Sequence, residues 1–154
     1  MYLLSVLLLT VVLPLVSFAV EHFFLGSPLP LAALLGKWFV FWAAGIRLFV
    51  AGLRQLFQPQ FTSKHIFHIE TDQVLPIVRE LGIANLAMGT AGIISLWMPT
   101  FVLPIAIVGA IFYGIAGVNH TRGQGRSTNE TVAMTTDLWV SLVLIAYVVV
   151  TLAN

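Results

Sequence analysis

The chain has 154 residues, of which 59% are hydrophobic and only 8% charged, and its formal net charge is +1. So little charge leaves too little polar surface for a soluble globular domain. The near-neutral charge gives no argument for nucleic-acid binding, and the absence of cysteine excludes disulfides and thiolate chemistry. The composition therefore indicates an integral membrane protein.

Five apolar stretches follow one another, each about as long as the roughly 20 helical residues that cross a bilayer. We expect spans at about residues 2–24, 31–57, 73–98, 101–118 and 131–152. Strands of a membrane barrel would alternate in polarity, and these stretches do not. The sequence predicts one all-α membrane domain over residues 1–154, a compact bundle of about five transmembrane helices with a four-helix core and an additional N-terminal helix. No Lys or Arg precedes the first stretch, so we expect a retained helix rather than a cleaved signal peptide.

The placement of Lys and Arg predicts the orientation of the bundle. With five spans, segments 54–72 and 119–130 lie on the same side as the N-terminus. These segments carry four of the basic residues: Arg54, Lys64, Arg122 and Arg126. The opposite side has Lys37. Because cytoplasmic loops are enriched in Lys and Arg, we expect the N-terminus in the cytoplasm and the C-terminus outside.

Polar residues recur at helical spacing inside the spans and predict a pocket. Charges at membrane depth are costly and normally face a partner or a wet cavity. From the rise of a helix, Arg47, Glu80 and Asp137 all lie in the cytoplasmic half of the bilayer. The candidate pocket residues are Arg47, Glu80, Asn85, Tyr113, His120, Glu130 and Asp137. A purely structural ion pair of Arg47 with one carboxylate is the alternative.

Small residues lie on two faces of the third span. Glu80 shares one face with three alanines, and Asn85 shares the other with three glycines. Small residues let helix backbones approach closely in membranes, so we expect this span to be central and packed on both faces.

The segment around His65 and His68 invites a metal interpretation, because the two imidazoles would share a helical face. A zinc site needs further ligands, and His120 or Glu130 from the neighbouring connection are the candidates. The alternative is an amphipathic interfacial segment whose apolar side chains dip into lipid.

Three short stretches resemble a family of small uncharacterised bacterial membrane proteins, catalogued as a domain of unknown function. They are Arg79–Asn85, Gly114–His120, and Asn129–Glu130 with Ala133, Met134 and Asp137. The resemblance covers about residues 35–153, and more distantly the chain is similar to the DoxX-like proteins, compact bundles of four or so spans. It implies that Glu80, Asn85, His120, Glu130 and Asp137 form the family's polar set, and that the protein lies in a bacterial inner membrane.

Three functions remain open from the sequence. Some DoxX-like proteins accompany quinone-linked or oxidative-stress systems, so the resemblance implies an accessory or ligand-binding subunit of a larger, redox-linked membrane complex. The second is a membrane-embedded enzyme or metalloprotein that uses the carboxylate and histidine pocket, and the third is a small transporter or proton path. We expect the bilayer and other membrane subunits, or further copies of the chain, as partners. The residues name no cofactor.

Overall fold

The structure is a computed structural model that describes residues 2–121 and 128–153, and every regular element in these ranges is helical. Five helical segments are long and apolar enough to cross a membrane, judged by length and composition. They are Leu3–Phe24, Leu31–Phe57, Asp72–Ile94, Pro99–Thr121 and Thr128–Ala153. The predicted all-α bundle with five such helices is confirmed.

The first two spans are not uniform α-helices, which the sequence did not indicate. Their parts are α1 (Tyr2–Leu7), η1 (Leu8–Val12), α2 (Leu13–Ala19) and η2 (Val20–Phe24), then α3 (Leu31–Phe39), η3 (Val40–Ile46) and α4 (Arg47–Phe57). The segments η1, η2 and η3 are π-helical. A π-helix bonds i to i+5 and so changes the angular spacing of its side chains. The face that would join Lys37 to Arg47 in a regular helix is therefore divided at η3.

The π-helical segment η1 ends at Val12, two residues before Pro14. Proline has no N–H to bond the carbonyl four residues earlier, and its ring crowds that carbonyl. Here the carbonyl is that of Thr10, and it accepts a hydrogen bond from the indole Nε1–H of Trp139 at 3.2 Å. The proline thus frees a backbone acceptor that fastens the first span to the last.

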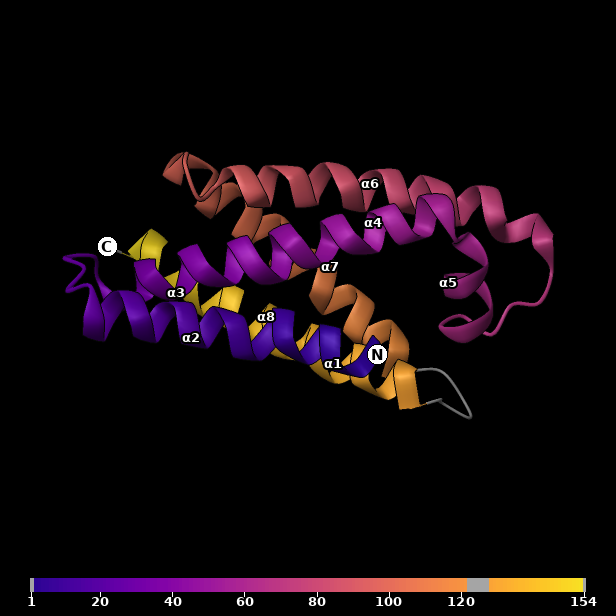
Figure 1. Cartoon of the computed structure of the whole chain (residues 1–154), viewed down its shortest axis with the longest axis horizontal. Helices are drawn as coiled ribbons and strands as arrows, with labels where there is room; N and C mark the ends of the chain where they lie inside the picture. The colour runs from indigo at the N-terminus through magenta and orange to yellow at the C-terminus, as the bar shows by residue number, and fades with distance from the viewer. Residues whose placement is uncertain (1, 122–127, 154) are drawn as a thin grey trace.

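Helix α6 (Leu75–Ile94), which follows the short helix η4 (Asp72–Val74), packs against the second span along glycines and lies along one edge of the bundle (Figure 1). A Cβ on Gly92 would come within 2.6 Å of the Gly45 Cα, and one on Gly52 within 2.7 Å of the Gly82 carbonyl oxygen. On the opposite face of α6, the side chains of Glu80, Ala84 and Ala87 are exposed. The expectation that this span is packed on both faces was therefore wrong, since these side chains on the second face are exposed.

The remaining long helices are α7 (Val102–Thr121), after η5 (Pro99–Phe101), and α8 (Thr128–Ala153), and they pack closely against each other. Helix α6 ends at Ile94, earlier than the expected boundary near 98. Just after it, the Ser95 hydroxyl donates to the Gly92 carbonyl at 2.6 Å. The fourth span continues to Thr121, beyond the expected 118. The two ends of the chain lie far apart along the long axis (Figure 1).

A short helix, α5 (Pro59–His65), closes one end of the bundle beside α4 and α6 (Figure 1). The chain after it is held by Ser63, whose hydroxyl donates to the Ile69 carbonyl at 2.5 Å. Within this turn His68 has a φ of 55°. This left-handed conformation is uncommon for a residue other than glycine. Of the basic residues expected at this end, Arg122 and Arg126 lie outside the described residues.

Candidate functional site

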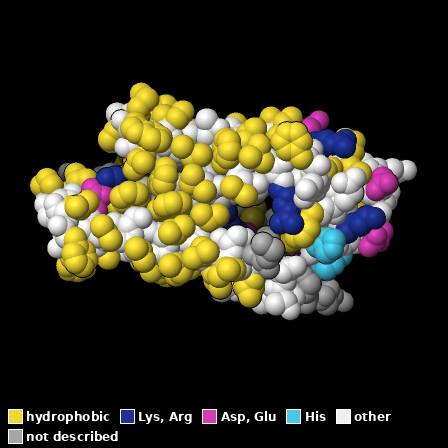
Figure 2. Space-filling view, viewed as in Figure 1, with side chains coloured by type: hydrophobic (Ala, Val, Ile, Leu, Met, Phe, Trp, Pro, Cys, Tyr) yellow, Lys and Arg dark blue, Asp and Glu magenta, His cyan; other side chains and the backbone are white. Residues whose placement is uncertain are grey.

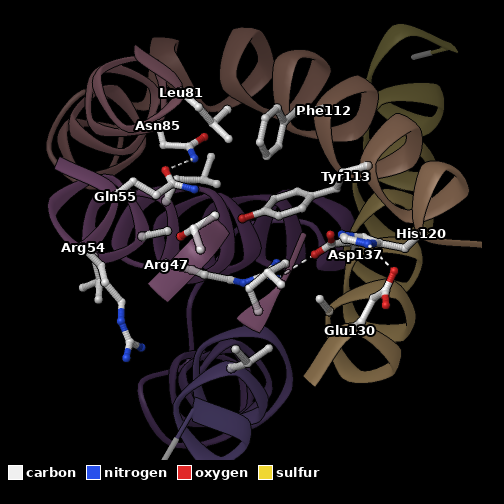
Figure 3. A pocket seen from close by; sticks show the side chains of 18 of the residues that line it. Arg47, Arg54, Gln55, Leu81, Asn85, Phe112, Tyr113, His120, Glu130 and Asp137 are labelled. Carbon is white, nitrogen blue, oxygen red and sulfur yellow. Dashed lines mark hydrogen bonds and ion pairs between the residues drawn. The ribbon is translucent and has the colours of Figure 1, made fainter. Parts of the chain in front are cut away.

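A cavity of about 520 Å³ lies at the α5 end of the bundle, and all five spans contribute to its walls (Figure 3). Its size falls within the range of small-molecule sites, about 300–1,000 Å³. The cavity reaches inward to Arg47, which stands about 15 Å from Phe57 along its helix at 1.5 Å per residue. It thus runs from near the end of the spans toward the bundle centre.

The inner wall of the cavity carries a buried ion pair. The Arg47 guanidinium contacts the Asp137 carboxylate at 2.6 Å, and the two side chains are 13% and 7% exposed. The guanidinium also lies over the ring of Tyr113, 4.9 Å from its centroid, and the Tyr113 hydroxyl donates to the Ala43 carbonyl at 2.5 Å. The second, fourth and fifth spans are joined here by charge, ring and hydrogen bond.

A second charged cluster connects the cavity with the surface. One Glu130 carboxylate oxygen lies 3.5 Å from Nε2 of His68, and the other lies 3.5 Å from Nδ1 of His120. Glu130 and His120 are mostly buried, whereas the side chain of His68 is 49% exposed. His120 points toward both Glu130 and Asp137 (Figure 3). Titratable groups therefore follow one another from the exposed His68 to Asp137.

An amide pair forms the wall opposite this cluster. The Asn85 side-chain N–H donates to the Gln55 carbonyl oxygen at 2.8 Å, and both residues are buried. The Asn85 side-chain oxygen is also buried and has no hydrogen-bond partner among the described residues. A buried acceptor without a partner costs free energy comparable to a lost hydrogen bond. This oxygen is thus available to a donor placed in the cavity.

Arg54 lines the outer part of the cavity and stacks on Phe61 of α5, with its guanidinium carbon 3.4 Å from the ring centroid. Among the described residues, no carboxylate lies within ion-pair distance of Arg54. Residues 122–127, outside the described ranges, include no Asp or Glu. The Arg54 charge is held in place by an aromatic ring rather than by an acid.

The cavity opens at the side of the bundle. Its lining includes Val6 and Leu9 from the first span and Val50 and Ala51 from α4. Helix α1 packs mainly against α8, and its approach to α4 is much looser. In Figure 2 a hollow with basic side chains at its rim lies where a broad hydrophobic surface meets the more polar α5 end. The opening therefore lies at the boundary between lipid-facing and polar surfaces.

The structure brings six of the seven predicted pocket residues to this cavity: Arg47, Asn85, Tyr113, His120, Glu130 and Asp137. Glu80 is the exception, because it is exposed on the face of α6 that points away from the second span. Which face of α6 is buried depends on the glycine contacts with α4, and the spacing of charges alone does not reveal it.

The predicted metal set is not assembled as expected. The His65 ring stacks on Phe61, with 5.0 Å between the ring centroids, and does not line the cavity. Only His68, His120 and Glu130 come together. In the part of the chain that the structure describes, no group of three or more His, Asp or Glu side chains is arranged to hold a metal ion. The metal interpretation therefore lacks its ligand geometry.

Sequence reasoning missed Gln55 and the ring of Phe61 at this site. Gln55 carries a weak signal, since it is a lone amide eight residues after Arg47 in an apolar span. Reasoning also missed a polar cluster at the opposite end of the bundle, where Glu21 pairs with Lys37 at 2.7 Å and accepts from Trp38 at 2.8 Å. Lys37 therefore belongs to a different site from Arg47.

The protein is therefore all-helical, with five membrane-length helices and a cavity with polar residues in its lining that is open at one side. The chain belongs to DUF6790, a family of unknown function, whose family model matches residues 1–154. The match includes the first span, which the resemblance seen in the sequence left out. No curated protein and no solved structure matches the chain.

Proposed function

We propose that this protein is a membrane-embedded ligand-binding protein, whose cavity takes up a small molecule from the bilayer. The observation that carries the proposal is a cavity of about 520 Å³ that combines an unpartnered Asn85 oxygen with a side opening between α1 and α4. Pockets for small molecules are mostly apolar with a few convergent polar groups, and this lining has that character.

The purely structural alternative explains less of the arrangement. An ion pair that only holds helices together needs Arg47 and Asp137, which lie 2.6 Å apart. Such an ion pair needs no open cavity beside it. It also does not explain why Asn85, in the cavity lining, has a buried side-chain oxygen without a hydrogen-bond partner among the described residues. Packing normally leaves few voids larger than a water molecule. The unfilled space therefore supports a binding role.

The biological setting that we propose is an accessory subunit of a larger membrane complex, with a redox system as the first candidate. The bundle would lie in a bacterial inner membrane with its N-terminus in the cytoplasm. The excess of basic residues at the α5 end supports this orientation. The resemblance to DoxX-like proteins supports the redox setting, and exposed apolar side chains such as Leu142 and Val149 leave room for other helices to pack.

Native mass spectrometry of protein extracted gently from its own membrane tests the binding role. We expect a specific additional mass on the native protein. The variant Ala51→Phe fills the cavity and should lose this mass, whereas Ala84→Phe places the same ring on the exposed face of α6 and should retain it. Equal retention by both variants would show that the bound molecule lies elsewhere.

One observation favours a second candidate, an enzyme or proton-transfer protein. The Glu130 carboxylate bridges an exposed and a buried imidazole and leads toward Asp137. Such a row of groups suits acid–base chemistry on a bound molecule. Under this candidate, Glu130→Gln should abolish turnover of the molecule found in the mass spectrum while leaving its binding intact. If the native protein and this variant both release the molecule chemically unchanged, this candidate is ruled out.

A further inference from the structure

We infer that the cavity selects an anionic amphiphile with a single apolar chain, and that Arg54 binds its head group. This inference rests on the proposed binding function and adds the chemical class of the ligand. A carboxylate or a phosphate monoester head supplies the same chemistry, a compact anion with oxygen acceptors.

The charges that line the cavity determine the sign of charge that a ligand can carry. Arg47 is compensated by Asp137 at 2.6 Å, and the Glu130 carboxylate lies beside two imidazoles, 3.5 Å from a nitrogen of each, and not beside Arg54. Arg54 is the lining residue whose positive charge meets no carboxylate among the described residues. A cation with no carboxylate beside it favours an anionic group of a ligand at that point of the cavity.

The other acidic residues of the chain are engaged or placed elsewhere. Glu21 pairs with Lys37 at the far end, Glu70 pairs with Lys64 at 3.7 Å, and neither Asp72 nor Glu80 lines the cavity. The chain has six acidic residues in all. Arg54 therefore has no acid from its own chain within reach in the described structure.

The Arg54 side chain is held in place by the ring of Phe61. Its guanidinium lies flat on the Phe61 ring, 3.4 Å from the centroid. Stacking fixes the plane of the guanidinium and leaves its N–H edge to donate, often in pairs, to carboxylate or phosphate oxygens. Arg54 also stands only about 5 Å along the helix from Phe57, which places it near the polar boundary of the spans. That is the level at which lipid head groups lie.

The apolar part of the cavity lining suits the remainder of the ligand. Next to Arg54 the lining is apolar and reaches from the side opening toward the bundle centre, through Leu9, Val50, Leu81 and Phe112. Val50 is 51% exposed, so this wall is continuous with the lipid-facing surface. A chain can thus enter sideways from the bilayer while its head stays at Arg54. The size of about 520 Å³ suits one drug-sized molecule rather than a two-chain phospholipid.

The test compares three probes with the same sixteen-carbon chain: hexadecanoate, hexadecyl phosphate and hexadecan-1-ol. Binding is measured by native mass spectrometry and by the shift in melting temperature, on full-length protein in a neutral detergent at pH 8. The native protein should bind at least one anion more tightly than the alcohol. The variant Arg54→Gln should lose about tenfold in affinity for that anion and none for the alcohol.

Two variants serve as controls. Arg79→Gln removes an exposed charge from α6 outside the cavity lining and should bind as the native protein does. Arg54→Lys keeps the charge but loses the planar fork, so it should bind with intermediate affinity and also covers the case in which Arg54→Gln fails to fold. Preference for hexadecanoate indicates a fatty-acid ligand, and preference for hexadecyl phosphate indicates one derived from a phospholipid.

Equal binding of alcohol and anions, or unchanged anion binding in Arg54→Gln and Arg54→Lys, would overturn the assignment to Arg54 while the proposed binding function stands. A second outcome is that none of the three probes binds while the native protein still carries an additional mass that Ala51→Phe loses. That result would overturn the inference of a ligand with an apolar chain and leave the proposed binding function in place. Failure of all probes and no additional mass would overturn both proposals.

Discussion

Asp137 lies in an apolar helix of 26 residues, and its charge is tolerated there because Arg47 meets it at 2.6 Å. Taking one ion of a pair into a nonpolar region costs several kcal/mol, which the partner offsets only when the geometry is good. Here the Tyr113 ring lies under the guanidinium and adds a cation–π contact. The pair is thus stable only as a unit.

Removing one member should therefore cost more than removing both. We expect Asp137→Asn to lower the free energy of unfolding by about 3–5 kcal/mol, because it leaves a buried Arg47 charge without its acid. The double variant Arg47→Met, Asp137→Leu should lose clearly less. Lys64→Met serves as the control, since its exposed pair with Glu70 is worth roughly 0–1 kcal/mol. Equilibrium unfolding in mixed micelles measures all three, and equal losses for the single and double variants would contradict this account of the pair.

The sequence predicted the charged cavity residues that need a partner inside the bundle. Arg47 and Asp137 could be placed from spacing and depth, because buried charges require partners. Glu80 could not, because it lies on a face that α6 exposes. The Arg54–Phe61 contact also could not be predicted, since it depends on where the short helix α5, which begins at Pro59, packs against α4.

Pro14 and Trp139 together determine how the Thr10 carbonyl is bonded, and this coupling can be tested. We expect Trp139→Phe to cost about 1–2 kcal/mol, because it leaves the Thr10 carbonyl without its indole donor at 3.2 Å. In a Pro14→Ala background the same substitution should cost less, since an alanine there has a backbone N–H that can bond the Thr10 carbonyl within the helix. Trp97→Phe, at an indole that is 71% exposed, is the control. Unfolding free energies that add across the double-mutant cycle would show that the proline and the indole are independent.

The close glycine contact between α6 and the second span leads to a further prediction. A Cβ at Gly92 would lie 2.6 Å from the Gly45 Cα, so Gly92→Ala forces two backbones apart and should cost about 1–3 kcal/mol. At Gly109 the nearest atom is the mobile end of Leu144 at 2.9 Å, so Gly109→Ala should cost less. Thermal unfolding in detergent gives the ranking, and a reversed order would show that the α4–α6 contact is not backbone-limited.

The spans themselves were predictable because about 20 apolar residues in succession have few alternatives to a membrane-length helix. The π-helical segments were not. Nothing local marks η3, residues 40–46, as different from its neighbours, and its register depends on packing against α6. The expectation of two packed faces on α6 failed for a related reason, because small residues permit close packing without stating which helix supplies it.

We predict that the five membrane-length helices all cross the bilayer, which would place the two ends on opposite sides, and the basic residues predict that the N-terminal end is inside. A reporter that is active only in the cytoplasm should therefore work at the N-terminus and fail at the C-terminus. Reversing the charge bias by Arg54→Glu and Lys64→Glu should weaken this preference. Activity at both ends would contradict the five-span topology.

We propose that the cavity beside Arg47, Asn85 and Arg54 holds a ligand taken from the bilayer. The most direct measurement is a cryo-electron microscopy map of the protein extracted from its native membrane, at a resolution that shows bound lipids. We predict continuous non-protein density inside the cavity, with its polar end at Arg54. A map that shows lipids on the outer surface but an empty or collapsed cavity would contradict the claim.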